Sequence, residues 1–169
     1  IVGNDGGVYI SRTAGKSWHY CDNMPIEEFY EVAVDSSTPF NLGGGLQDNN
    51  AWYGPSNNIH GGSIKGRHWV SVAGGDGEYV VPAPSNPNIV YAESQNGYIS
   101  RTDLKTGIRN SIKPTFKGVS MISPKDLKYR YNWTTPIAVS YKDANTVYLG
   151  ANVLFKTTDG GRTWDAISP

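Results

Sequence analysis

The stretch that decides the fold is "FKTTDGGRTW", residues 155–164, because it occurs twice in the chain. The other copy is "YISRTAGKSW" at residues 9–18, with Trp18 aligned on Trp164. A segment that returns with its small and aromatic residues in register is typical of repeat proteins, in which each copy forms one structural unit. The repeats are therefore the first indication of the fold.

Further copies lie between these two. "SNPNIVYAESQNGYIS" at 85–100 aligns with "KDANTVYLGANVLFKT" at 142–157, and a weaker copy, "STPFNLGGGLQDNNAWY", covers 37–53. The unit is roughly 45–57 residues long and contains short alternating strands separated by Gly, Asn, Asp or Pro. A four-stranded blade of a β-propeller has about this period.

The repeats predict an all-β chain, a β-propeller of four-stranded antiparallel blades. Residues 1–169 would form a single propeller segment with about three and a half blades, since closed propellers have about 4–8. We therefore expect a fragment or a partial propeller that further chain completes. The expected blades are about 1–22 (partial), 28–73, 77–113 and 134–169, with an insertion at about 114–133.

Composition excludes several functions. Lys+Arg and Asp+Glu are 15 each among 169 residues, which gives no electrostatic case for binding nucleic acid. Cys21 is the one cysteine, so neither an intrachain disulfide nor a thiolate metal cluster is expected. The histidines show no metal-ligand spacing, and we expect no metal and no cofactor. No apolar run approaches the ~20 residues of a transmembrane helix.

"TTDGGRTW" fits the pattern S/T-x-D-x-G-x-T-W and falls in the hairpin between the third and fourth strands of a blade. Asp159 can accept hydrogen bonds from the N–H groups of its own turn, Gly161 can adopt positive φ, and Trp164 can pack between sheets. In the first copy Thr13 stands where the Asp would be, which a turn tolerates better than a binding site. A structural role is therefore predicted for Ser11, Gly15, Trp18, Thr157, Asp159, Gly161, Thr163 and Trp164.

Turns between second and third strands lie at the opposite end of each blade. They read "GNDGG", "GLQDNN" and "SQNG", either because Asn, Asp and Gly form turns or because they make a polar binding rim. The long connection before the last blade adds aromatic residues beside an Arg, which suit contact with a partner or a sugar ring, although the connection can equally be a packed loop. The partner-binding candidates are Asn4, Asp5, Gln47, Asp48, Asn49, Tyr129, Arg130 and Trp133.

Catalytic chemistry has little support in the sequence. A glycosidase needs two carboxylates about 5–10 Å apart. On the candidate face these can only be Asp5, Asp48, Asp76 and Glu78, of which Asp48 and Asp76 are weak catalytic candidates. The second-to-third turns contain no Arg, which argues against a sialidase mechanism.

The motifs "GNDGGVYIS", "LGGGLQDN", "GGDGEYV" and "FKTTDGGRTW" make the chain similar to bacterial secreted Asp-box, or BNR-repeat, propellers of the sortilin-like and glycosyl-hydrolase-like kind. The resemblance covers about residues 1–105 and 133–169. It implies a periplasmic or secreted propeller. Proteins of this kind include xyloglucan-cleaving enzymes, peptide-binding receptors and assembly factors of photosystems, so the fold alone does not fix the function.

Two hypotheses follow. The first is a non-catalytic protein–protein interaction module, an extracytoplasmic accessory subunit or assembly factor of a membrane-associated complex such as a photosynthetic one, whose partner is another protein. The alternative is a glycoside hydrolase of the Asp-box propeller type that acts on glycans resembling β-glucan or xyloglucan.

Overall fold

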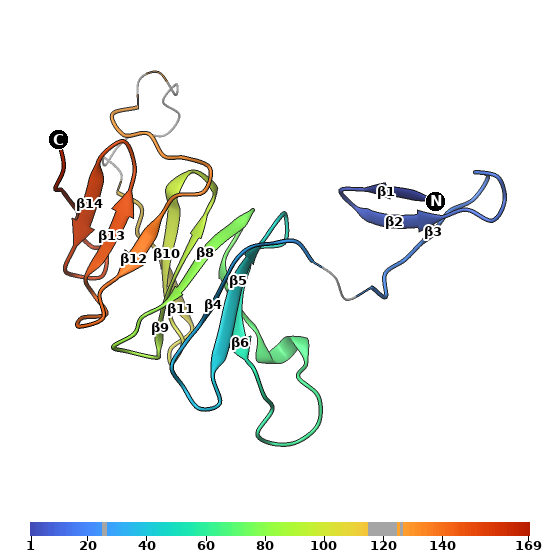
Figure 1. The fold of residues 1–169 in the computed structure, drawn as a ribbon, viewed down its shortest axis with the longest axis horizontal. Helices are drawn as coiled ribbons and strands as arrows, with labels where there is room; N and C mark the ends of the chain where they lie inside the picture. The colour runs from blue at the N-terminus through green and yellow to red at the C-terminus, as the bar shows by residue number, and fades with distance from the viewer. Residues whose placement is uncertain (25–26, 115–124, 126) are drawn as a thin grey trace.

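The computed structural model describes residues 1–24, 27–114, 125 and 127–169, and within them the chain forms four antiparallel sheets (Figure 1). The two helical segments described over their full length are short 3-10 turns, η1 (Gly66–His68) and η2 (Gln95–Gly97). The predicted fold class, an all-β partial propeller of antiparallel blades, is therefore confirmed. Most of the expected insertion lies outside the described residues.

Every sheet is built from strands that follow one another along the chain. The N-terminal sheet consists of β1 (Val2–Asn4), β2 (Gly7–Ile10) and β3 (His19–Tyr20). The second sheet consists of β4 (Phe29–Val34), β5 (Asn41–Leu46), β6 (Ala51–Pro55) and β7 (Val70–Ala73). The third sheet consists of β8 (Gly77–Pro82), β9 (Ile89–Ser94), β10 (Tyr98–Asp103) and β11 (Ile108–Ser111). The fourth sheet consists of β12 (Ile137–Val139), β13 (Val147–Gly150), β14 (Leu154–Thr157) and β15 (Asp165–Ala166).

The third sheet is the centre of the packed part of the molecule. Its first strand, β8, contacts β4 and β5 of the second sheet and β12 of the fourth. Every residue of β9 is buried, because neighbouring sheets cover both faces of this strand. That position explains the nearly continuous apolar run "IVYA", which is typical of a strand buried on both sides.

Two apolar clusters hold the three packed sheets together. One lies between the second and third sheets and includes Tyr53, Val72 and Val80. The other lies between the third and fourth sheets and includes Tyr91 and Phe155. The packing therefore links blades in chain order, as a propeller requires.

The glycine run of β5 permits an unusually close approach between the second and third sheets. A Cβ atom added at Gly45 would lie 2.2 Å from the carbonyl oxygen of Gly77, so no side chain fits between the two backbones. This contact brings the end of β5 against the start of β8. It thereby places the loops at that end of the two sheets side by side.

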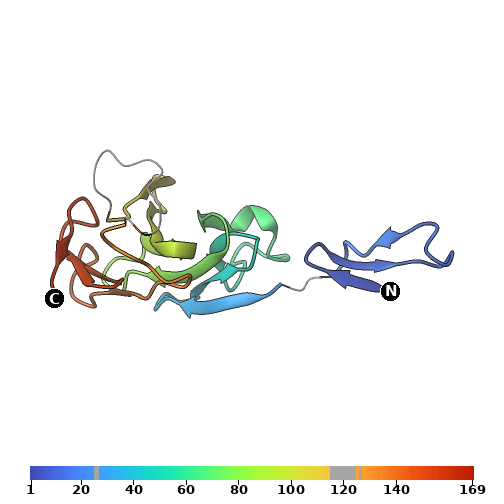
Figure 2. The same cartoon turned by 90° about the horizontal axis from the view of Figure 1, so that it is seen from above.

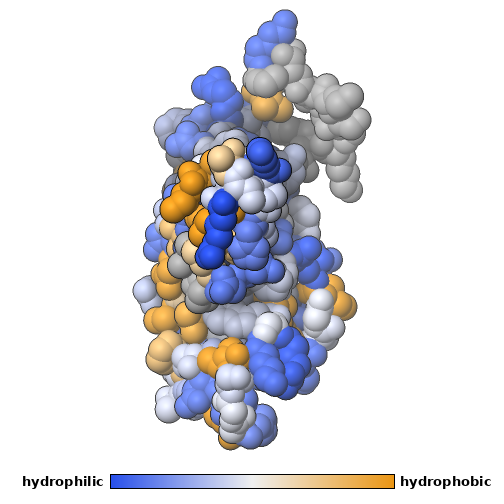
Figure 3. Space-filling view, turned by 90° about the vertical axis from the view of Figure 1, so that its right-hand side faces the viewer, coloured by the Kyte–Doolittle hydropathy of each residue, from blue (hydrophilic) through white to orange (hydrophobic). Residues whose placement is uncertain are grey.

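The N-terminal sheet extends away from the other three (Figures 1 and 2). Seen from the end of the molecule that carries the N-terminal sheet, apolar side chains gather along one flank (Figure 3). In β4, Phe29, Val32 and Val34 expose 53%, 53% and 61% of their surface. One face of the second sheet is therefore left apolar and uncovered by the described residues.

Candidate functional site

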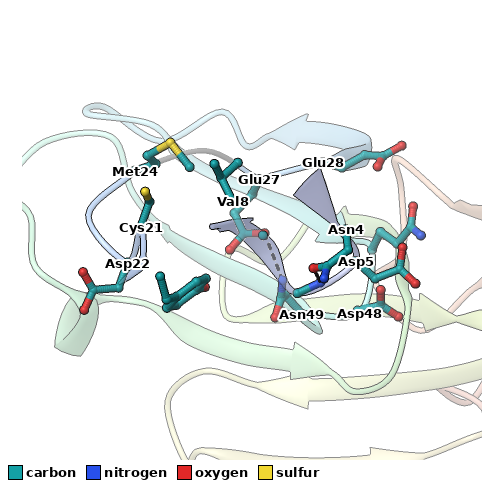
Figure 4. A pocket seen from close by; sticks show the side chains of 14 residues that line it. Asn4, Asp5, Val8, Cys21, Asp22, Met24, Glu27, Glu28, Asp48 and Asn49 are labelled. Atoms are coloured by element: carbon teal, nitrogen blue, oxygen red, sulfur yellow. Dashed lines mark hydrogen bonds between the residues drawn. The ribbon is translucent and has the colours of Figure 1, made fainter. Parts of the chain in front are cut away.

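The turns of the N-terminal and second sheets meet around one hollow. It has a volume of about 670 Å³, and its lining includes Asn4 and Asp5 from the β1–β2 turn and Gln47, Asp48 and Asn49 from the β5–β6 turn (Figure 4). Five of the eight partner-binding candidates thus lie together. Their role in binding stays a prediction.

The lining of this hollow is acidic and amide-rich. It also contains Asp22, Glu27, Glu28 and the ring of Tyr20, and no Lys or Arg is among the described residues that line it. The side-chain amide of Asn49 donates to Glu27 Oε2 at 3.0 Å, which ties the β5–β6 turn to the segment before β4. Hydroxyl-rich or cationic groups match such a surface better than anions do.

Asp48 and Asp76 come together although they lie far apart in the sequence. The backbone N–H of Asp48 donates to Asp76 Oδ1 at 2.8 Å. A hydrogen bond with the Asp76 carboxyl, followed by desolvation and the charges of Asp76 and Asp5, raises the pKa of Asp48. Two carboxyl groups in contact cannot both ionise easily, so Asp48 holds a proton more readily than an isolated Asp.

Backbone hydrogen bonds from the neighbouring turns hold the loop that carries Asp76. The backbone N–H of Asp76 donates to Gln95 Oε1 at 3.0 Å, and the backbone N–H of Asn50 donates to the carbonyl oxygen of Gly75 at 3.0 Å. These bonds connect the loop before β8 to both neighbouring turns. The carboxylate of Asp76 is thus presented at the point where the second and third sheets approach each other.

Two fully buried carboxyl groups lie beneath this loop. Glu78 Oε2 accepts a hydrogen bond from the Thr134 hydroxyl at 2.7 Å, and Glu93 Oε1 accepts one from the Gly97 N–H at 3.1 Å. Burial raises the pKa of Glu93 to about 8 and also raises the pKa of Glu78. The other carboxyl oxygen of each residue is buried without a hydrogen-bond partner among the described residues.

Glu93 was not predicted from the sequence as a site residue. The sequence did carry a signal, because Glu93 is the one acidic residue in the run "IVYAES", whose other residues are apolar or small. A charged residue is unusual on a buried strand. Glu78 was recognised as a residue of the candidate face but was not expected to be buried. Its burial follows from Thr134 and the loop that covers it.

The other three partner-binding candidates lie on that covering loop. Tyr129 is half-buried, with its ring centroid 4.7 Å from that of Phe155, whereas Arg130 is exposed. Trp133 exposes 50% of its surface, and its carbonyl oxygen accepts the Asn96 N–H at 2.9 Å. The loop therefore packs over the third and fourth sheets, and none of the three residues lines the hollow around Asp48.

The turn at 157–164 satisfies its own polar groups. Asp159 accepts from the Thr163 N–H at 3.0 Å, the Thr163 hydroxyl at 2.7 Å and the Thr157 hydroxyl at 2.8 Å. These bonds lower the pKa of Asp159. Trp164 is half-buried, and its indole N–H donates to the carbonyl oxygen of Ile112 at 2.7 Å.

No metal centre is found among the described residues, since no three His, Cys, Asp or Glu side chains gather as ligands would. Within the same residues, no helix has the length and apolar character needed to cross a membrane.

No family profile matches the chain. No curated protein sequence matches it either. Among solved structures, the chain is similar to the GH74 enzyme of Niastella koreensis, with a TM-score of 0.55 and 15% sequence identity. The similarity covers 93% of this chain and 25% of that enzyme, so the chain spans about a quarter of its length. At this identity the comparison supports the propeller-type fold and nothing finer.

Proposed function

We propose that this chain is part of an extracytoplasmic Asp-box propeller that hydrolyses glycans of the β-glucan or xyloglucan type. The observation that carries the proposal is the carboxyl group of Asp48, whose pKa is raised by contact with Asp76, at the rim of a hollow of about 670 Å³. A glycosidase uses a general acid with a raised pKa, and the pKa of Asp48 is shifted in that direction. The structural similarity to a GH74 enzyme agrees with this class of activity.

The proposed roles follow from position. Asp48 acts as the general acid towards the glycosidic oxygen, and its neighbour Asp76 raises its pKa. Asp5 lies on the equivalent turn of the N-terminal sheet, lines the same hollow and contributes to the raised pKa of Asp48 through its charge. Asp5 is the candidate for the second carboxylate that a two-carboxylate mechanism requires, either as base or as nucleophile.

The rest of the hollow suits a sugar chain. The ring of Tyr20 lines it and offers an apolar face, while Asn4, Gln47 and Asn49 offer amide groups to sugar hydroxyls. A volume of this size is within the range of small-molecule sites.

The test is a screen of polysaccharides, including xyloglucan and mixed-linkage β-glucan, with reducing-end release as the readout. Asp48→Asn and Asp5→Asn should each lower the rate by at least about 10²-fold. Asp103→Asn is the matched control, because Asp103 lies at the third-to-fourth-strand turn of the third sheet and bonds the N–H of Lys105. Absence of hydrolysis, or hydrolysis that survives both substitutions, would contradict the proposal.

The interaction module remains a second candidate because of one specific observation, the uncovered apolar face of β4. Phe29, Val32 and Val34 each expose more than half of their surface there. Under this hypothesis the partner is another protein, such as a subunit of a membrane-associated complex. Val32→Asp together with Val34→Asp should then abolish co-purification of that partner, whereas Asp48→Asn should leave it unchanged.

A further inference from the structure

A second hollow lies between the second and third sheets. It has a volume of about 300 Å³, and its lining comes from the end of β7, from β9, and above all from β10 and β11. The side chains that matter for its chemistry are those of Tyr98, Ser100, Arg109 and Ser111. None of them lines the hollow around Asp48, so the two hollows are separate sites.

The register of the third sheet gathers the polar side chains of this hollow on one face. In the pairing of β10 with β11, Ser100 lies opposite Ser111 and Thr102 lies opposite Arg109. Because side chains alternate between the two faces of a strand, Ser100, Ser111 and Arg109 share a face. That face meets the second sheet, since the hydroxyl of Ser100 donates to the carbonyl oxygen of Val72. Strands therefore position these side chains, and strands hold a site more precisely than loops do.

Arg109 carries the charge of this lining, and it is exposed. Its Nη1 donates to the carbonyl oxygen and to the hydroxyl oxygen of Ser71 at 3.5 and 3.4 Å, which are long hydrogen bonds. Among the described residues, Arg109 forms no ion pair with an acidic side chain. A guanidinium has five N–H donors in a planar fork that matches a carboxylate. Arg109 therefore keeps most of its donors for a ligand in the hollow.

A second positive charge and an aromatic ring stand beside Arg109. Tyr98 lines the hollow and exposes 59% of its surface. Nζ of Lys113 lies 4.1 Å from the centroid of the Tyr98 ring and donates to the carbonyl oxygen of Asn96 at 2.8 Å. The bond to Asn96 holds the ammonium group at the edge of the hollow. A ligand against Tyr98 therefore meets positive charge from both Arg109 and Lys113.

The acidic side chains nearest to this hollow belong to other parts of the molecule. Glu93 pairs with Ile99, whose side chain belongs to the cluster between the third and fourth sheets, so Glu93 faces away from the second sheet. Asp76 accepts the N–H of Asp48 in the first hollow. Among the described residues, the lining of the second hollow contains an Arg and no Asp or Glu, which is the reverse of the first. An anionic ligand is therefore the electrostatic match.

We propose that this hollow binds a uronic acid, free or as a unit of an acidic glycan, with the guanidinium of Arg109 holding the sugar carboxylate. A sugar matches the lining better than a peptide does, because the exposed Ser111 offers a hydroxyl and Tyr98 offers a ring face against which a pyranose can lie. The apolar side chains of the lining, Ala73 and Ile99, are buried and leave no apolar pocket for a peptide side chain. The volume is at the lower end of small-molecule sites, which suits a short segment of a glycan.

The first experiment is isothermal titration calorimetry at low ionic strength with a tetramer of galacturonic acid, compared with the neutral tetramer of glucose, cellotetraose. The acidic tetramer should bind more tightly. Arg109→Gln should weaken its binding by at least about tenfold, and Arg109→Lys, which keeps the charge and loses the fork, should weaken it less. Lys113→Gln should have a smaller effect than Arg109→Gln, because Nζ already donates to Asn96. Arg67→Gln is the matched control, because Arg67 is an equally charged, exposed residue on η1.

The second experiment separates a uronic-acid site from a general attraction for anions. Free galacturonic acid and its tetramer should both bind; tighter binding of the tetramer identifies the glycan as the source of the ligand, and equal affinities identify the free sugar acid. Asp48→Asn should bind the tetramer as the wild type does, so the result is independent of whether the chain hydrolyses glycans. Absence of binding to both uronic acids, binding that survives Arg109→Gln, or equally tight binding of polyglutamate would overturn the proposal.

Discussion

The Ser11–Trp18 and Thr157–Trp164 turns share three equivalent hydrogen bonds from their backbone N–H groups and have different surroundings. In the first turn Thr13 Oγ1 accepts a bond from an amide N–H four residues further on, at 2.9 Å. In the second, Asp159 Oδ1 accepts the equivalent bond at 3.0 Å. A hydroxyl and a carboxylate thus close the same turn, which shows that the turn is encoded locally and does not depend on the packing around it.

Packing is what separates the two turns. Trp164 lies against the cluster between the third and fourth sheets, where its ring meets Phe155 edge-on with centroids 6.4 Å apart. Trp18 exposes 48% of its surface and has no sheet to pack against among the described residues. The sequence pattern therefore specifies a turn, and the neighbouring sheet determines how much that turn stabilises the fold.

The largest expected difference is between the two tryptophans. Trp164→Ala removes the ring from the cluster and leaves the carbonyl oxygen of Ile112 without its donor, so it should lower the free energy of unfolding by about 2–4 kcal/mol. Trp18→Ala should change it by no more than about 0.5 kcal/mol. Urea denaturation at submicromolar concentration measures both. Equal losses would mean that Trp18 is packed in solution.

A smaller difference is expected between the two glycines. Gly161 has φ +90° and Gly15 has φ +82°, so alanine is strained at both positions. Only at Gly161 would the added Cβ lie 2.6 Å from Ile112. We expect Gly15→Ala to cost about 1 kcal/mol and Gly161→Ala about 2–3 kcal/mol. Thermal unfolding of the two variants provides the comparison, and similar melting temperatures would argue against a tight contact at Ile112.

The sequence predicted the features that repeat and missed those that depend on contacts between blades. The repeats fixed the strands, and the Thr157–Trp164 pattern fixed the bonds of Asp159, because both follow from residues close together in the chain. The contact between Asp48 and Asp76 was not predicted, because it depends on the approach of Gly45 to the Gly77 backbone. Nor could the repeats indicate that the N-terminal sheet extends away from the second.

A third difference between the packed sheets and the N-terminal sheet is their response to pH. Glu93 pairs with Ile99 in the third sheet, and the equivalent residue of the N-terminal sheet is Gly3, which pairs with Val8. Burial raises the pKa of Glu93 from 4.5 to about 8. Between these two values the folded state holds a proton that the unfolded state has released, so stability is full below about pH 4.5 and falls as the pH rises towards 8.

The corresponding substitution is Glu93→Gln, which keeps the size of the side chain and removes its titration. The wild-type free energy of unfolding should decrease by about 1 kcal/mol per pH unit between pH 5 and 8 because of this group. The variant should lack that slope. Urea denaturation at several pH values measures it, with Glu31→Gln on exposed β4 as the control that keeps the wild-type slope. An unchanged slope in Glu93→Gln would show that Glu93 is ionised in the folded protein.

The smallest expected effect comes from exchanging the two turn-closing residues. Asp159→Thr gives the second turn the residue that the first already uses, so the melting temperature at pH 7 should fall by only a few degrees, less than for Asp159→Ala. The hydrogen bonds of Asp159 hold its pKa below the ordinary 3.8, so its contribution is present above that pH and is lost as the pH falls below it. The wild-type protein should therefore lose more stability between pH 5 and pH 3 than Asp159→Thr does. Calorimetry at the two pH values measures this difference, and a variant as acid-sensitive as the wild type would show that the carboxylate is not what distinguishes the second turn from the first.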